Sequence, residues 1–208
     1  MGRRNQHSRE QQIDMALRAA EQIVVRDGIA GLSMRKVADA IGYTVGNLYL
    51  LFQNQDDLLA TINERTTDEI HADLSEATST IADPARKLRR MAVAYVEFAQ
   101  RHPHRWRLMF EHQLPEPMQP RTSSELRVQR MFELVESALK PLVPQASGKK
   151  LRTTATALWS GVHGVATLAV TGKLKWSGLT SYSTLCEELI DDCLAGIQAR
   201  RGAKSSRS

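Results

Sequence analysis

Residues 32–52 read LSMRKVADAIGYTVGNLYLLF, and two short helices can be drawn through them. Ser33 is placed to cap the first helix, which ends at Gly42, a residue suited to the left-handed conformation common after a helix C-terminus. Apolar side chains recur between these two residues at helical spacing, namely at Met34, Val37, Ala38 and Ile41. The pattern predicts a short amphipathic helix followed by a tight turn.

A second and shorter helix follows the turn, with Thr44 placed to cap it. Leu48 and Phe52 lie four residues apart and would face inward, which leaves the opposite side for another purpose. Gly46 has no side chain, so the backbone can closely approach a large partner. The major groove of DNA is about 12 Å wide and admits one helix, so the pair is typical of a helix-turn-helix. The structural alternative is a tight helical corner, with Tyr49 and Phe52 packed against the preceding helix.

The flanking residues extend the motif in both directions. An amphipathic helix ends before it at Asp27-Gly28, and the acidic-aliphatic DDLL of residues 56–59 follows it. Together, residues 11–60 resemble the DNA-binding domain of the TetR family of bacterial transcriptional regulators. In that family the second short helix commonly reads Ser-Lys-Gly-Thr-Leu-Tyr-x-x-Phe, and the positions that match here are Thr44, Gly46, Leu48, Tyr49 and Phe52.

This resemblance implies a DNA-binding surface. Ser33 would contact a phosphate while capping its helix, Tyr49 would place its hydroxyl on the DNA backbone, and Asn47 would bond an adenine edge or a phosphate. The predicted DNA-binding residues are Ser33, Arg35, Lys36, Thr44, Val45, Gly46, Asn47, Tyr49 and Gln55. Val45 and Gln55 stand where the family often has lysine, so we expect modest affinity unless an arm compensates from the minor groove through Arg3, Arg4 and Arg9.

The rest of the chain continues the helical periodicity, and strand patterns are nearly absent. We therefore predict an all-α fold of about nine helices. Residues 1–55 would form a three-helix DNA-binding domain with the helix-turn-helix, and residues 56–208 a helical effector-binding and dimerisation domain. Asn54 is placed to cap the fourth helix, and the pair Asp83-Pro84 to begin the fifth.

Two segments of the second domain, RHPHRWRLMF (101–110) and ALWSGVHGVATL (157–168), resemble a TetR subgroup named for its Trp-His-Gly elements. Trp159 and His163 lie four apart on one helical face with small neighbours, and a cavity between helices is a plausible effector site. The predicted effector-binding residues are Tyr95, Trp106, Met109, Phe110, Phe132, Trp159 and His163. The alternative is that His163 is a buried histidine bonded to a neighbouring carbonyl, and Trp159 fills the core.

The last two long helices are predicted over 151–171 and 184–201. In the family this pair joins its twin across a two-fold axis, which implies a homodimer and a palindromic double-stranded DNA operator. The first of the two carries more apolar surface than a monomer needs, including Val162, Val165 and Leu168.

Composition excludes several other classes. No apolar run reaches the roughly 18 residues needed to span a bilayer, so a membrane location is not expected. The cysteines, Cys186 and Cys193, suggest free thiols in a reducing compartment and favour a cytoplasmic protein with no bound metal or cofactor. The net charge is +5, yet residues 1–55 carry seven basic against five acidic residues, so charge alone does not identify a DNA-binding protein.

An enzyme is the rival class, because histidines occur at positions 102, 104, 112 and 163. Neither a nucleophile elbow nor an HExxH pattern accompanies them, so we reject catalysis and metal binding. The sequence predicts a cytoplasmic DNA-binding transcriptional regulator, specifically a repressor that acts as a homodimer and is released by an unidentified small molecule. The alternative is an effector sensor that has lost operator binding and acts through protein contacts.

Overall fold

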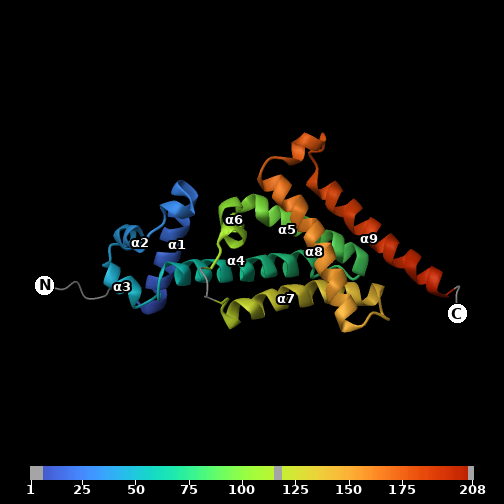
Figure 1. Cartoon of the computed structure of the whole chain (residues 1–208), viewed down its shortest axis with the longest axis horizontal. Coiled ribbons are helices and arrows are strands. Elements are labelled where there is room, and N and C mark those ends of the chain that lie inside the picture. The colour runs from blue at the N-terminus through green and yellow to red at the C-terminus, as the bar shows by residue number, and fades with distance from the viewer. Residues whose placement is uncertain (1–6, 115–118, 206–208) are drawn as a thin grey trace. The chain divides into compact units, whose positions relative to one another are not determined.

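The computed structural model describes residues 7–114 and 119–205, and every regular element in these ranges is a helix (Figure 1). The all-α prediction is therefore confirmed. The α-helices are α1 (Arg9–Asp27), α2 (Met34–Ile41), α3 (Val45–Tyr49), α4 (Gln55–Thr78), α5 (Pro84–Arg101), α6 (Pro103–Glu111), α7 (Thr122–Leu139), α8 (Gly148–Val170) and α9 (Tyr182–Ser205). Three 3-10 turns, Ile29–Gly31, Lys140–Leu142 and Leu174–Ser177, lie between them.

The chain forms two compact units. Unit 1 comprises residues 1–66 and 104–124, and unit 2 comprises residues 67–103 and 125–208. Helix α6 thus belongs to the compact unit that contains α1 to α3, although its sequence lies between helices of unit 2. These units are defined by contacts within the chain, whereas the boundary predicted after residue 55 divides the chain by function, and that boundary stays a prediction.

Unit 1 is built around α1. Its N-terminus is closed by a capping box. Ser8 Oγ accepts from the backbone N–H of Gln11 at 3.2 Å, and Gln11 Oε1 accepts from the backbone N–H of Ser8 at 2.8 Å. One apolar face of α1 then packs on α2, the end of α3, the start of α4 and Leu108 of α6. The buried members include Ala16, Ala20, Val37, Ala38, Leu48, Leu58 and Ile62.

Local capping chemistry sets the ends of the short helices, as the sequence predicts. Ser33 Oγ accepts from the Lys36 amide at 3.2 Å, and Thr44 Oγ1 accepts from the Asn47 amide at 3.2 Å. Gly42 takes the left-handed conformation at φ 74° and ψ 28°, which lets the chain turn directly from α2 into α3. Asn54 Oδ1 accepts from the Asp57 amide at 2.8 Å and caps α4.

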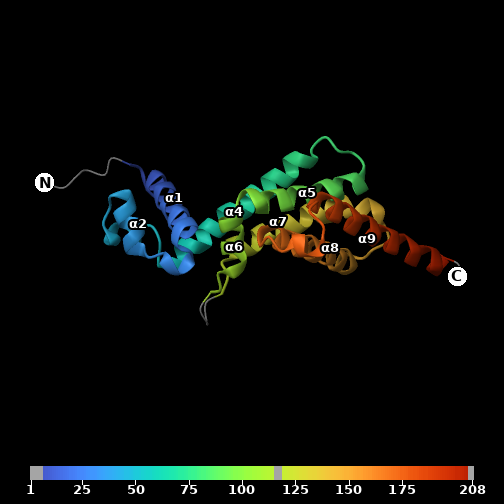
Figure 2. The ribbon, with the colours of Figure 1, turned by 90° about the horizontal axis from the view of Figure 1, so that it is seen from above.

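Unit 2 is a packed set of helices in which α5 contacts both α8 and α9, and these two contact each other (Figures 1 and 2). Asp83 caps α5, with Pro84 at its first position. Helices α8 and α9 approach closely at Gly161, where a Cβ atom would lie 2.8 Å from Leu189 Cδ2. An alanine at Gly161 would require the end of the Leu189 side chain to move, so the glycine favours this close approach.

Helix α8 carries a row of hydroxyl side chains that bond back to their own helix. The donor hydroxyls are four residues beyond the acceptor carbonyls, at donor–acceptor distances between 2.7 and 2.9 Å. The donors are Thr153, Thr154, Thr156, Ser160, Thr167 and Thr171. This back-bonding removes the need for other partners along the helix.

The later helices run beyond their predicted bounds. Helix α8 starts at Gly148 under a Ser147 cap instead of at residue 151, and α9 spans Tyr182–Ser205 instead of 184–201. Serine and glycine near a helix N-terminus are compatible with both cap and loop, so sequence alone places such ends within a few residues. No helix within the described ranges is long and apolar enough to cross a membrane.

Candidate nucleic-acid interface

Helix α3 presents two chemically different sides. Leu48 is completely buried and Phe52 nearly so, as the sequence predicts. Tyr49, one residue further, is 53% exposed, so much of its side chain stays in water, unlike those of Leu48 and Phe52. Leu50 is also exposed, although the sequence pattern did not single it out. We call Thr44, Gly46 and Tyr49, which are all exposed, the outward face of α3.

Gly46 has no structural role that a larger residue could not fill. It is not among the glycines with a positive φ angle, which in the described ranges are Gly28, Gly42, Gly172 and Gly178. A Cβ atom built on Gly46 would meet only Thr44 Oγ1, at an ordinary contact distance of 3.9 Å. The backbone conformation and the surrounding space at Gly46 therefore give no reason, within the fold, for a glycine instead of an alanine.

The basic residues beside α3 divide into two kinds. Arg35 is exposed on α2. Lys36 Nζ donates to the Gly31 carbonyl at 2.6 Å and lies 3.8 Å from Asp27 Oδ2, so its charge is partly engaged within unit 1. The ammonium group has three N–H donors and keeps its charge while one of them is bonded, so a role of Lys36 beside DNA stays a prediction.

The remaining predicted contacts occupy different positions. Val45 is half-buried and packs against the core of unit 1, and Gln55 is a half-buried first residue of α4. Arg9 begins α1 and is exposed. Arg3 and Arg4, the other arm residues, lie outside the described residues.

A chain of hydrogen bonds that the sequence did not predict connects α3 to α1 and to the turn before α3. Asn47 Nδ2 donates to Gln12 Oε1 at 2.9 Å, and Gln12 Nε2 donates to the His7 carbonyl at 2.9 Å. His7 Nδ1 lies 2.9 Å from the hydroxyl of Tyr43, in the turn between α2 and α3. One sequence signal could have revealed it: Gln12 is a polar residue at helical spacing with Ala16 on the buried face of α1.

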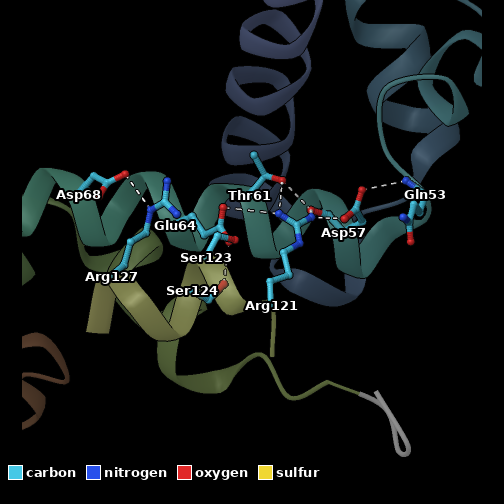
Figure 3. Close-up of polar contacts among 9 residues, drawn as sticks. All are labelled: Gln53, Asp57, Thr61, Glu64, Asp68, Arg121, Ser123, Ser124 and Arg127. Carbon is cyan, nitrogen blue, oxygen red and sulfur yellow. Dashed lines mark hydrogen bonds and ion pairs between the residues drawn. The ribbon is translucent and has the colours of Figure 1, made fainter. Parts of the chain in front are cut away.

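A second polar cluster lies along α4, where Arg121 reaches it from the segment before α7 (Figure 3). Arg121 donates to the Asp57 carbonyl at 2.7 Å and to Thr61 Oγ1 at 3.2 Å, and it also pairs with the Asp57 carboxylate. The other carboxylate oxygen of Asp57 accepts from the Gln53 amide at 2.8 Å. Arg121 is therefore connected, through one aspartate, to the segment that leads from α3 into α4.

The first turn of α7 continues this cluster. The hydroxyls of Ser123 and Ser124 donate to Glu64 Oε1 at 2.6 and 2.7 Å, and Figure 3 shows them beside Arg121. Further along the same two helices, within unit 2, Arg127 Nε donates to Asp68 Oδ2 at 2.8 Å. Charge-assisted bonds of this kind fix geometry more firmly than neutral ones.

Four of the predicted effector-binding residues meet in unit 2. The Tyr95 hydroxyl lies 3.1 Å from His163 Nδ1, and the His163 ring centroid is 5.2 Å from that of Trp159. Trp159 in turn meets Phe132 edge to face at 5.9 Å. Burial lowers the pKa of His163 from its ordinary value of 6.5, because the charged imidazolium is poorly solvated there. The Tyr95 hydroxyl is thus one partner of the His163 ring, and the alternative of a histidine bonded to a neighbouring carbonyl stays a prediction.

The other three predicted effector-binding residues lie on α6, in unit 1. The Trp106 and Phe110 rings are 4.9 Å apart, with Trp106 buried and Phe110 partly exposed. Met109 is half-buried, and the α6 residue that joins the unit 1 core is Leu108. Aromatic composition alone could not separate these residues from the cluster in unit 2, because both groups follow helical spacing.

The described ranges contain no candidate metal site. No three or more His, Cys, Asp or Glu side chains there are grouped so as to hold a metal ion. His112, one of the histidines considered for catalysis, has Nε2 3.0 Å from Asp56 Oδ1, a contact that joins the end of α6 to the start of α4.

Comparisons with known proteins agree with this geometry. A family model described as "Bacterial regulatory proteins, tetR family" matches residues 16–62, and one described as "Tetracyclin repressor-like, C-terminal domain" matches residues 88–193. A curated relative, the HTH-type transcriptional activator FasR of Mycolicibacterium smegmatis, is 26% identical over 137 residues. That match covers 64% of this chain and 63% of FasR, so the chain spans less than two thirds of the relative's length.

Solved structures share the fold. A protein of unknown function from Rhodococcus sp. RHA1 superposes with a TM-score of 0.76 at 20% identity, covering 94% of this chain and 98% of the other. AibR, solved in complex with isovaleryl coenzyme A and operator DNA, superposes with a TM-score of 0.62 at 18% identity, covering 86% of this chain and 96% of AibR.

The first family model matches residues that include α2 and α3, the two helices of the helix-turn-helix, and the second matches residues from α5 into α9. The resemblance to the Trp-His-Gly subgroup stays a prediction. These domains indicate a regulatory rather than a catalytic protein. The chain belongs to the TetR family of bacterial transcriptional regulators.

Proposed function

We propose that the protein is a ligand-responsive repressor that binds a palindromic operator as a homodimer and leaves it when a small molecule binds. The observation that carries this proposal is the outward face of α3. It combines an exposed tyrosine with a glycine that the fold itself does not need. A DNA groove against the helix backbone accounts for both features.

The predicted contacts would then have separate roles. The hydroxyls of Tyr49 and Ser33 would bond phosphate oxygens, and Arg35 would add charge beside them. The methyl groups of Val45 and Thr44 would meet base edges or sugars. Because Val45 and Gln55 carry no charge, we expect the salt dependence to be shallower, by roughly 0.9 in log–log slope for each lost ionic phosphate contact.

The dimer is supported by apolar side chains left exposed at the end of α8 and in the turn after it. Trp176 is 76% exposed, and Leu168 and Leu179 are each exposed by more than two fifths. A second copy packed through 151–171 and 184–201 would cover Leu168, and Trp176 and Leu179 lie in the segment that joins these two ranges. Two copies would address two half-sites, which accounts for a palindromic operator.

The effector proposal rests on the cluster of Tyr95, Phe132, Trp159 and His163. Its rings offer apolar contact, and the Tyr95–His163 pair offers one hydrogen-bonding position, a combination usual in small-molecule sites. Because AibR was solved with isovaleryl coenzyme A, short acyl-coenzyme A thioesters are the first compounds to test.

Release from DNA requires that the effector bind two conformations unequally, and a coupling of about 1 to 3 kcal/mol is typical. We propose the Arg121 cluster as the element that transmits this change within unit 1. Arg121 donates to the carbonyl of Asp57, and the carboxylate of Asp57 accepts from the backbone N–H of Gln53, just after α3. A shift of Arg121 would thus reach the segment that supports the outward face.

The test begins with selection of DNA from a random-sequence pool by the purified full chain. Fluorescence anisotropy then measures affinity for the selected duplex and for random DNA at two salt concentrations, and sedimentation measures the stoichiometry. Tight, salt-sensitive, sequence-selective binding by a dimer supports the proposal. A series of acyl-coenzyme A thioesters is then added, and a fall in anisotropy identifies a compound that releases the protein from the duplex. Equal, weak affinity for both duplexes would instead support the sensor that has lost operator binding. A reporter gene behind the selected site separates repression from activation.

A further inference from the structure

We infer that Gln12 is a positioning residue for DNA recognition: it holds Asn47 in the orientation that reads adenine. This inference rests on the proposed function, because it concerns how the outward face distinguishes one base from another. Gln12 lies on α1, behind α3, and nothing in the helix-turn-helix pattern assigns it a role.

The first observation is the burial of Gln12. Its side chain is 4% exposed, beside the apolar residues of α1. A buried amide is costly unless its polar atoms are bonded, and here both ends have partners. Oε1 accepts from Asn47 Nδ2 and Nε2 donates to the His7 carbonyl, both at 2.9 Å. Since one amide satisfies both bonds, neither partner can turn without leaving a buried polar atom unpaired.

The second observation is what this arrangement leaves available on Asn47. Its Nδ2 has two N–H bonds, and Gln12 takes one of them. Its Oδ1 accepts no hydrogen bond from the described part of the chain. The side chain therefore retains one acceptor and one donor, and these are the groups with which asparagine bonds N6 and N7 of adenine. A phosphate, which only accepts, would use just one of the two.

The third observation concerns the start of α1. The His7 carbonyl that accepts from Gln12 belongs to a residue whose ring also meets the Tyr43 hydroxyl at 2.9 Å. Gln12 is thus tied on one side to α3 and on the other to the turn that precedes it. An anchored side chain gives up less rotational freedom on binding, which favours selectivity for one base.

The experiment measures base preference, which a purely structural role would not change. From the site selected by the wild type, each half-site position is replaced by all four bases, and affinities are measured for the wild type, Gln12→Met, Asn47→Ala and the double variant. A bidentate contact predicts a preference for adenine at one position of roughly 5- to 150-fold. Gln12→Met should reduce that preference as far as Asn47→Ala does, and the double variant should lose no more than either one.

Two further variants keep the result interpretable. Asn47→Asp presents acceptors only and removes the donor that Gln12 Oε1 uses, so the overall affinity should fall while the preferred base changes from adenine to cytosine, whose N4 donates. This variant decides the matter if Gln12→Met fails to fold. Gln100→Met, at an exposed glutamine of α5, is the matched control and should leave every preference unchanged.

The outcomes separate the two proposals. If the wild type selects no sequence, the proposed function fails. If it selects a site but folded Gln12→Met keeps the full adenine preference, this inference alone is wrong. The inference is also wrong if Asn47→Asp weakens binding to all four bases alike, because that pattern belongs to a phosphate contact.

Discussion

Replacing Gly46 with alanine should stabilise the protein and weaken its binding to DNA, two effects of opposite sign. The new Cβ would meet only Thr44 Oγ1 at 3.9 Å, and the φ angle is not positive, so alanine fits without strain. Alanine also restricts the unfolded chain, which should raise the free energy of unfolding by about 0.4 to 1 kcal/mol. For a chain of this length, the melting temperature should rise by roughly 1 to 4 °C.

The loss in DNA binding follows from the same methyl group. On the outward face it would stand between the helix backbone and the DNA, so that the neighbouring contacts lengthen. Losing one good contact in the groove costs about 1 to 3 kcal/mol, which corresponds to roughly a 5- to 150-fold weaker affinity. Anisotropy with the selected duplex measures the affinity, and calorimetry measures the melting temperature.

Gly148→Ala provides the matched control. Gly148 is also an early residue of a helix, α8, and a Cβ atom there meets nothing within 4 Å. This variant should gain comparable stability and keep the wild-type affinity. If Gly46→Ala binds the selected duplex as tightly as Gly148→Ala does, the outward face of α3 is not the DNA-binding surface. If it melts below the wild type, Gly46 has an internal role that contradicts the reasoning.

Three other expectations can be tested on the same protein. Tyr49→Phe should weaken binding to all duplexes alike by roughly 2- to 12-fold, the value of one neutral hydrogen bond, and a change in sequence preference would contradict a phosphate contact. The lowered pKa of His163 means that the unfolded chain binds a proton first as the pH falls below 6.5, so stability is lost on acidification. The stability difference between wild type and His163→Gln should therefore shrink from pH 7.5 to pH 5.5 in thermal unfolding, and a constant difference would argue against a neutral buried imidazole. Burial raises the pKa of the Cys186 thiol to about 11, so maleimide at pH 7.5 should leave it unmodified until the protein is denatured, as peptide mass spectrometry would show.

Local chemistry explains what could be predicted from the sequence. Caps such as Ser33 and Thr44 act on amides three residues away, and Gly42 adopts a conformation that few other residues accept, so each signal lies within one turn of its effect. The inward side of α3 follows from the spacing of Leu48 and Phe52. These local signals were sufficient to predict the all-α fold and to predict which side of α3 is exposed.

Contacts between distant residues could not be predicted in the same way. Asn47 and Gln12 are 35 residues apart, and Arg121 meets Asp57 across 64 residues. No periodicity connects such pairs, because they depend on how helices pack. For the same reason the aromatic residues of α6 were grouped with His163 in advance, although the structure places Trp106 in unit 1. The bond from the Lys36 ammonium group to the Gly31 carbonyl was not predicted either, and the charge that Lys36 would bring to DNA stays a prediction.

The hydroxyls of α8 that bond back to their own helix affect the free-energy cost of burying that helix against another protein surface. A threonine-rich surface is normally costly to dehydrate, because each hydroxyl must give up its bonds to water. Here six hydroxyls already donate to carbonyls of their own helix. The donor of each hydroxyl is satisfied and only acceptor lone pairs remain beside methyl and methylene groups, so covering these side chains costs less than covering hydroxyls that donate to water. The hydroxyl positions of α8 therefore oppose the burial of its apolar side chains less than their number suggests.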